Sequence, residues 1–185
     1  MPNLYNMRGR DPLLSLKGNS RMNITHPQIS KELTYIDDFS SYVQGFLSEE
    51  LSISGIESCK EQIEDAEFHR IEIRKSIFEN CTFHNCNFEK ATFVDVVFQS
   101  CDLSSSKFAG AYFERCQLVS CKCIGIDMSD TIVKQTTFEK SNFRYSHFFK
   151  TKMTDVLFEH IDFTESSMIE SNLKRFVAKE SKFVK

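Results

Sequence analysis

The sequence lacks a long hydrophobic run and an excess of charge of one sign. No stretch of about 18 apolar residues occurs in the 185-residue chain, and the first residues lack the apolar core of a secretory signal. We therefore expect neither a membrane span nor a secretory leader, and the cytoplasm is the expected compartment. Because 41% of the residues are hydrophobic and 12% are aromatic, the chain can bury a continuous core in one folded unit.

The charges are close to balanced but divide unevenly along the chain. The formal net charge at pH 7 is -3. Residues 1–65 carry 6 Lys and Arg against 10 Asp and Glu, whereas residues 66–185 carry 17 against 16. The second part of the chain is thus nearly neutral.

One class of side chain returns at every fifth position from residue 68 to residue 183. Of these 24 central positions, 14 are Phe and eight are Leu, Ile, Met or Val, so that only Cys123 and Ala178 depart. A period of five matches neither the period of about 3.6 of a helix nor that of about 2 of a strand. The chain must therefore bend at a fixed interval and build a repeat array.

The position two residues before each central residue is mostly small, as in Ser76, Cys81 and Ala91. If both positions point inward, large rings fill the interior and small side chains let the backbone approach the axis. The other three positions of each pentad are mostly polar and are expected to face water. The expected core ladder consists of Phe78, Phe83, Phe88, Phe93, Phe98, Phe108, Phe113, Phe138, Phe143, Phe148, Phe158 and Phe163.

These pentads resemble the pentapeptide-repeat family, whose motif reads small, polar, Leu or Phe, polar, polar. The motif stands here as CTFHN, CNFEK, ATFVD, SKFAG and AYFER, and its register is unbroken over 24 units. The resemblance implies an all-β fold, a right-handed, four-sided β-helix in which about four pentads complete one coil. Residues twenty apart would then lie in columns, and about six coils would follow from the 24 pentads.

The repeat divides the chain into three segments. Residues 1–21 show no sustained periodicity and are expected to be disordered or extraneous. Residues 22–50 are expected to form an N-terminal cap, and the β-helix is expected to occupy residues 51–185, with a clear register from residue 66. Asp37 and Asp38 lie near the expected start of a short helix within residues 29–50. The apolar residues that recur there at helical spacing are Leu33, Ile36, Phe39, Val43, Phe46 and Leu47.

The register is faint at the start of the array. Ile53 and Ile63 occupy central positions, but Ser58 and Glu61 do not fit the motif, which indicates a degenerate first coil. At the other end the chain stops inside a pentad with no capping helix after Val184. We expect this open edge to find a partner.

The cysteines are the first candidates for chemistry. Cys81, Cys101 and Cys121 are twenty residues apart and would form one column, with Cys123 beside it, so that four thiols approach one another. Metal binding is the alternative to packing, but a straight column among Phe rings offers neither a tetrahedral arrangement nor polar support for a zinc ion. We expect packing, and neither a metal nor a cofactor. Cys59 lies outside the inward register and is the candidate exposed thiol, but no base is paired with it.

The histidines do not form a catalytic motif. His69, His84, His147 and His160 stand at outward positions on three different sides, and His26 precedes a proline in the cap. No loop interrupts the register to carry further catalytic groups. We therefore do not expect an enzyme.

The candidate protein contact is a column of outward apolar residues, together with one apolar residue beside it. Its residues are Ile77, Val97, Leu157 and Val177, with Val119 beside them, where the motif expects polar side chains. Exposed apolar ladders usually cover something. Either the N-terminal helix folds back over Ile77 and Val97, or this side meets a second protein. Because Leu157 and Val177 lie beyond the reach of a short cap, we expect a protein contact near the C-terminal end.

A neighbouring side gathers basic residues together with acidic ones. A nucleic-acid groove needs a denser basic stripe with aromatic residues between the charges, so we expect a solvated side of mixed charge and no direct nucleic-acid binding. The residues concerned are Arg74, Lys75, Arg115, Lys134, Lys152, Lys174 and Arg175, with Glu72, Asp95, Glu114 and Asp155.

Two functional hypotheses follow. Within the family, the Phe-centred repeats are similar to those of the quinolone-resistance proteins, which are dimers that resemble duplex DNA and act on DNA gyrase. This chain departs from them in having no inserted loop, no C-terminal dimerisation helix and no strongly acidic rod. The resemblance implies a non-catalytic protein that binds gyrase by DNA mimicry, with a homodimer formed through the C-terminal coil. The alternative is a rigid scaffold or interaction module for an unrelated protein partner.

Overall fold

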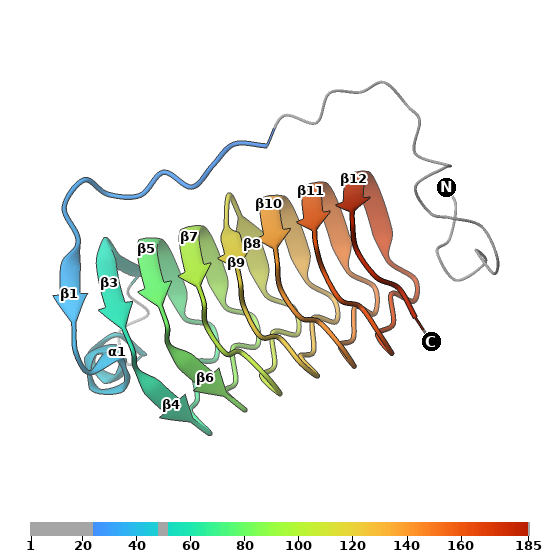
Figure 1. Cartoon of the computed structure of the whole chain (residues 1–185). Coiled ribbons are helices and arrows are strands. Elements are labelled where there is room, and N and C mark those ends of the chain that lie inside the picture. The colour runs from blue at the N-terminus through green and yellow to red at the C-terminus, as the bar shows by residue number, and fades with distance from the viewer. Residues whose placement is uncertain (1–23, 48–51, 185) are drawn as a thin grey trace.

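The chain forms a parallel β-solenoid of about seven turns with one short helix at its N-terminal end (Figure 1). The computed structural model describes residues 24–47 and 52–184. The expectation of disorder for residues 1–21 therefore lies outside the described residues. The solenoid has about one turn more than the six expected, because the faint pentads from residue 52 onward also form a coil.

The strands are short and follow one another around the rod. Within the described residues the elements are β1 (Thr34–Ile36), α1 (Phe39–Leu47), β2 (Ser52–Ser54), β3 (Ile56–Cys59), β4 (Gln62–Glu64), β5 (Glu72–Glu79), β6 (Thr82–His84), β7 (Thr92–Gln99), β8 (Tyr112–Glu114), β9 (Gln117–Val119), β10 (Ile132–Glu139), β11 (Lys152–Glu159) and β12 (Asn172–Lys179).

Each coil pairs with the next in parallel at a shift of twenty residues. Ile73 pairs with Phe93, and Phe93 pairs with Phe113 in the following coil. The same shift joins Val133 to Met153. Because the central residues recur every five positions, a coil of twenty residues has four sides, and each central residue lies over another one.

The corners of the coil are made by residues in the left-handed backbone region. Every fifth residue from Gly55 to Glu180 has a positive φ, between 46° and 69°, and only Gly55, Gly110 and Gly125 among them are glycines. For the other 23 residues this conformation costs about 1–2 kcal/mol each. The corner N–H groups donate to carbonyl oxygens of the next coil, as from Lys60 to Glu79 at 2.9 Å, and these bonds help to offset that cost.

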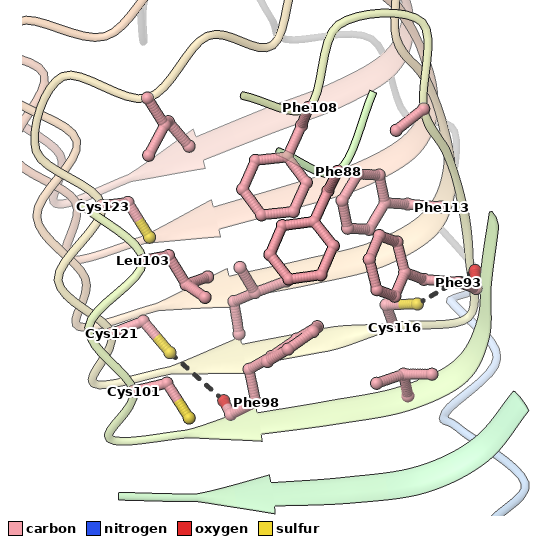
Figure 2. Packing of buried hydrophobic residues seen from close by; sticks show 14 of the residues in the cluster. Phe88, Phe93, Phe98, Cys101, Leu103, Phe108, Phe113, Cys116, Cys121 and Cys123 are labelled. Atoms are coloured by element: carbon pink, nitrogen blue, oxygen red, sulfur yellow. Dashed lines mark hydrogen bonds between the residues drawn. The ribbon is translucent and has the colours of Figure 1, made fainter. Parts of the chain in front are cut away.

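Phenylalanine rings fill the interior in stacked columns (Figure 2). The ring of Phe78 lies 5.3 Å from that of Phe98, and the rings of Phe88 and Phe108 are 5.0 Å apart. All twelve Phe residues of the expected ladder are at most 2% exposed. Stacked and edge-on ring contacts of this kind add to the free energy gained by burial alone.

The small inward side chains leave room for the backbone and also form hydrogen bonds with its N–H and carbonyl groups. The hydroxyl of Ser106 donates to the carbonyl of Phe83 at 2.6 Å and accepts a hydrogen bond from the N–H of Cys86 at 2.9 Å. The thiol of Cys121 lies 3.3 Å from the carbonyl of Phe98 in the same way (Figure 2). Most buried Ser, Thr and Cys at this position therefore bond to the coil before them, whereas the hydroxyl of Thr131 donates to Met128 of its own coil.

The short helix expected within residues 29–50 is present as α1. The apolar residues before its expected start were not predicted to form a strand, and Thr34–Ile36 form β1. The spacing of Leu33 and Ile36 matches a helix, yet Ile36 pairs with Ser58 of β3 and extends the sheet by one strand. The helix begins after Asp38, close to the start expected at Asp37 and Asp38, and the carboxylate of Asp38 accepts the N–H of Ser41 at 2.9 Å.

The helix packs against the coil that contains Ser58 and Glu61, the two residues that do not fit the motif. Phe39 is 0% exposed and packs edge-on against Phe78, with the ring centroids 5.1 Å apart. Phe78 follows Ser58 in its column, so the small serine leaves space for the ring of Phe39. Burial raises the pKa of Glu61, while a hydrogen bond from the backbone N–H of Phe39 opposes the rise. Ser58 and Glu61 thus adapt the first coil to its cap.

The stacked columns predict a large difference between two adjacent residues. Phe98→Ala should lower the free energy of unfolding by about 3–5 kcal/mol, because it leaves a cavity between Phe78 and the residues below. Its outward neighbour serves as the control, and Gln99→Ala should cost less than about 0.5 kcal/mol. Urea titration of both variants measures this difference. Equal losses would contradict the inward and outward assignment.

Candidate protein-interaction surface

The expected apolar column exists, but polar residues interrupt it. The backbone register runs from Ile77 through Val97, Gln117 and Thr137 to Leu157, and then to Val177. All of these side chains except those of Gln117 and Thr137 are apolar, and each of the four apolar ones is half-buried. The column therefore consists of two separate apolar pairs, one in the first part of the rod and one in its last coils.

Val119 does not join this apolar column. It lies in the adjacent column, paired with Gln99 on one side and Glu139 on the other. The structure thus places it among polar neighbours. A single half-buried valine in such a column needs no partner.

An extended segment, not the helix, reaches the side of the rod. Residues 24–33, called here the N-terminal strap, run along the outside of the solenoid from the level of β10 to β1 (Figure 1). The N–H of Gln28 donates to Asp95 Oδ1 at 3.0 Å, and His26 Nδ1 lies 3.2 Å from Gln117 Nε2. Helix α1 packs instead on the end of the core, through Phe39. Of the two alternatives for Ile77 and Val97, the structure therefore does not support coverage by the helix.

Asp95 anchors the strap through a buried ion pair. Its side chain is 4% exposed and accepts from Arg115, with Nε to Oδ1 at 2.7 Å and Nη2 to Oδ2 at 2.9 Å. Burial alone would raise the pKa of Asp95, but the hydrogen bonds from Arg115 and Gln28 outweigh burial and hold the pKa below its ordinary value. Asp95 is therefore ionised at neutral pH and holds two segments that are far apart in sequence.

The side of mixed charge contains several internal ion pairs. Arg74 bonds to Glu72, Arg115 also bonds to Glu114 at 2.6 Å, and Arg175 bonds to Asp155. In contrast, no ion pair within the described residues involves Lys152 or Lys174. The basic charge of this side is thus partly neutralised and does not form a continuous stripe.

Burial and neighbouring groups hold three of the buried cysteines in the protonated form. Burial raises the pKa of Cys86 to about 11 and that of Cys116 to about 12. The contact with Cys121 raises the pKa of Cys101 to about 12. Only the thiolate binds metals or attacks electrophiles, so these thiols are inert at neutral pH. Within the described residues, the thiol column does not bring three sulfur atoms close enough for a shared metal ion.

Sequence reasoning missed one group of possible metal ligands. One ligand atom from each of Glu57, Cys59 and Glu79 lies within 4.8 Å of the others. Cys59 is half-buried rather than exposed, and burial together with the two carboxylates raises the pKa of its thiol. The carboxylates thus disfavour the thiolate that metal binding requires. The twenty-residue register between Cys59 and Glu79 could have revealed this proximity.

The outward histidines remain apart in the structure. His69 and His84 are exposed, His147 Nδ1 lies 3.3 Å from Ser167 Oγ, and His160 Nδ1 lies 3.2 Å from Glu180. None of these contacts among described residues joins a histidine to a nucleophile with a third orienting group.

None of the helices in the described part of the chain is both long and apolar enough to cross a membrane.

Exposed large apolar side chains occur in the last coils, and none of them belongs to the contact residues that the sequence predicted. Phe149 and Ile169 lie in one outward column, joined by the hydrogen bond from Lys150 N to Ile169 O at 3.0 Å. Phe183 stacks on Phe163 at 4.8 Å but remains 40% exposed. The exposed members of this group lie on two neighbouring sides of the last coils and are together called here the C-terminal apolar patch: Tyr145, Phe149, Ile169, Phe183 and Val184. The outward pentad positions of Phe149 and Ile169 were a readable signal.

Comparisons with known proteins agree with this architecture. Residues 66–104 match the profile described as pentapeptide repeats (8 copies), and residues 91–168 match the profile described as pentapeptide repeat region. No match is found among curated proteins.

Several solved structures are similar to this chain. Full-length QnrB1, a plasmid-mediated fluoroquinolone resistance protein, is 16% identical with a TM-score of 0.41, over 78% of this chain and 89% of that one. The pentapeptide repeat protein Rfr23 from the cyanobacterium Cyanothece 51142 is 10% identical with a TM-score of 0.43, over 77% and 98%. HetL, involved in heterocyst differentiation regulation in Nostoc sp. strain PCC 7120, is 7% identical with a TM-score of 0.22, over 80% and 94%.

Thiol exposure predicts the order of cysteine modification. In the native protein Cys59 should react first with a disulfide reagent such as Ellman's reagent, because the other six cysteines are buried. Because its pKa is raised, the rate should keep increasing at pH values above the ordinary range of a cysteine thiol. Cys59→Ser should abolish the early phase, and Cys86→Ser is the control that should leave it. An early phase that survives Cys59→Ser would refute the assignment.

The ion pair under the strap predicts a local change in stability. Asp95→Ala should increase hydrogen exchange at the amide of Gln28, which loses its acceptor, and Asp102→Ala is the matched control because it removes an exposed twenty-residue pair with Lys122. Since the pKa of Asp95 is lowered in the folded state, its contribution is present above the ordinary carboxyl pKa and is lost as the pH falls through the lowered value. Protection of Gln28 that is unchanged in Asp95→Ala would show that this bond does not hold the strap.

Proposed function

Since this chain belongs to the pentapeptide-repeat family, we propose that it acts without catalysis, by binding another protein through side chains fixed on the outside of its rod. The observation that carries the proposal is the C-terminal apolar patch, defined above. Large apolar side chains that gather at one end of a rod mark a protein contact more often than an isolated exposed residue does.

Rigidity supports this function. The outward side chains stand on a backbone that is fixed by twenty-residue pairing from one coil to the next. Binding through such a surface requires little ordering of the backbone, so more of the contact free energy remains as affinity. Phe149 and Ile169 occupy corresponding positions of successive coils, which gives a partner a fixed apolar spacing.

The chemistry of the described side chains supports a role other than catalysis. Burial keeps Cys86 and Cys116 protonated, and His147 and His160 contact Ser167 and Glu180 at separate places on the rod. An acid, a base and a nucleophile held in mutual contact would be needed for catalysis.

DNA gyrase is the narrower proposal for the partner, and it comes from the resemblance to the quinolone-resistance proteins. A DNA mimic needs negative potential along the rod. Here Asp102 pairs with Lys122 at 2.8 Å, and Asp155 pairs with Arg175, so that positive and negative charges alternate in the columns. This alternation favours a protein partner that recognises apolar and mixed polar groups over one that recognises phosphates.

The last described coil of the rod bears on the oligomeric state. Within the described residues β12 pairs with β11 on one edge only, and Phe183 beside it is partly exposed. We propose that this end takes part in the protein contact, and a homodimer through the C-terminal coil is one form of that contact. Light scattering of the purified chain would distinguish the dimer from the monomer.

The apolar patch predicts the outcome of a binding experiment. The chain with Phe149→Ser and Ile169→Ser should lose the proteins that the unchanged chain captures from a bacterial lysate, because its apolar contact is gone. The matched control carries His69→Ser and Glu89→Ser in the same outward column near the other end, and it should capture them equally. Mass spectrometry compares the captured proteins, and urea titration checks that both variants remain folded.

Two outcomes would contradict these proposals. Equal capture by the Phe149→Ser, Ile169→Ser variant would show that the patch is not the contact. For the narrower proposal, gyrase supercoiling is measured with and without ciprofloxacin, and the absence of both inhibition and protection at micromolar protein would exclude gyrase as the partner.

A further inference from the structure

Two four-residue sequences that differ only at the third residue occur at the same place in the coil. Asp-Val-Val-Phe at residues 95–98 and Asp-Val-Leu-Phe at residues 155–158 lie sixty residues apart, which is three coils of twenty residues. In each case an arginine follows twenty residues after the aspartate, at Arg115 and Arg175. The register therefore places two copies of the same group of side chains along one edge of the rod.

The two copies have the same geometry. Asp95 and Asp155 both occupy left-handed corners, with φ of 59° and 56°. Each aspartate receives two parallel bonds from its arginine, from Nε to Oδ1 and from Nη2 to Oδ2. We call Asp95, Arg115 and Val97 the first seat, and Asp155, Arg175 and Leu157 the second seat.

Only the first seat is covered by a described segment. Gln28 of the N-terminal strap donates its backbone N–H to Asp95, and Val94 beside it is buried although it stands at an outward position. At the second seat the aspartate side chain is 13% exposed rather than 4%, and the arginine 38% rather than 22%. No described residue other than Arg175 donates a hydrogen bond to Asp155.

The geometry points to the second seat as a docking site for an extended, acidic segment of the protein partner. Its backbone N–H would donate to Asp155 as Gln28 does to Asp95, and an apolar side chain would rest on Leu157 and Val177. This inference rests on the proposed function and names a second contact for the same partner. Paired backbone and side-chain recognition of this kind is a general way to bind extended peptides.

The surrounding charges determine which extended segment fits. Lys152 and Lys174 flank the second seat, and no ion pair within the described residues engages either of them. The segment of this chain that precedes the strap is basic, with Arg8, Arg10, Lys17 and Arg21. An acidic segment from another protein is therefore the better electrostatic match than the chain's own N-terminal residues.

The strap itself supplies the probe. A fluorescent peptide with the sequence of residues 24–33, carrying His26→Glu and Lys31→Glu, keeps the extended backbone of the strap and adds negative charge. Fluorescence anisotropy should show that it binds the full-length chain more tightly than the unsubstituted peptide does, and that added salt weakens it. Asp155→Ala should reduce the affinity about tenfold, as expected for the loss of a hydrogen bond to a charged acceptor.

Two further variants keep the test independent of folding. Lys152→Glu with Lys174→Glu should reduce the affinity and remove most of the salt dependence, while leaving the core untouched. Asp102→Ala is the matched control because it removes the twenty-residue ion pair with Lys122 elsewhere on the rod. This control should bind the acidic peptide as the unchanged chain does.

Four results would overturn the inference. The first is that the acidic peptide does not bind at millimolar concentration, and the second is that Asp155→Ala binds it equally. The third is that Asp95→Ala is the only variant that loses binding. The fourth is that binding arises only after residues 1–23 are deleted, which would show that the chain's own segment fills the second seat. The proposed function is tested separately in the lysate experiment. If Asp155→Ala captures a partner that the Phe149→Ser, Ile169→Ser chain does not capture, the proposed function stands and the second seat is excluded as a contact.

Discussion

Parallel backbone hydrogen bonds between coils that pair at a shift of twenty residues hold every other feature of this protein in place. They require each coil to have the same length, and so they require a corner at every fifth residue. Most corners are made by residues other than glycine, each of which adopts a left-handed conformation that it would not favour alone. The conformation persists because the corner N–H bonds to the next coil and because the rings inside stack only at this register.

The part of the fold that depends on this register could be predicted from the sequence. A single side-chain class at intervals of five residues determined which Phe residues lie inside and which positions face outward, and the solenoid and its family are confirmed. The number of turns was underestimated because Ser58 and Glu61 break the motif. In the structure both residues belong to a regular coil: Ser58 leaves space for the ring of Phe39, and Glu61 accepts a hydrogen bond from the backbone N–H of Phe39.

The N-terminal region could not be predicted in the same way, because its contacts follow no period. Leu33 and Ile36 have helical spacing, yet Ile36 lies in β1, since pairing with β3 extends a sheet that would otherwise expose an edge. The contact between Gln28 and Asp95 spans 67 residues, and nothing in the local sequence of the strap specifies it. For the candidate surface, the column of Leu157 and Val177 was readable from the register, and Gln117 and Thr137, which interrupt it, stand at the same register.

A rod built in this way can copy a binding site simply by repeating a short sequence at a multiple of twenty residues. In a globular fold a repeated tetrapeptide has no defined spatial relation to its copy, because each copy has different neighbours. Here the shift of sixty residues between Asp95 and Asp155 places both at the same corner. Each is bonded to an arginine that follows it by twenty residues, in the next coil. What then distinguishes the copies is the set of outward residues around them: Val94 at the first is replaced by Thr154 at the second, and Lys152 and Lys174 add positive charge there. Outward residues contribute little to the core, so these positions can differ between coils without loss of the fold, and recognition can differ along the rod while its backbone remains constant.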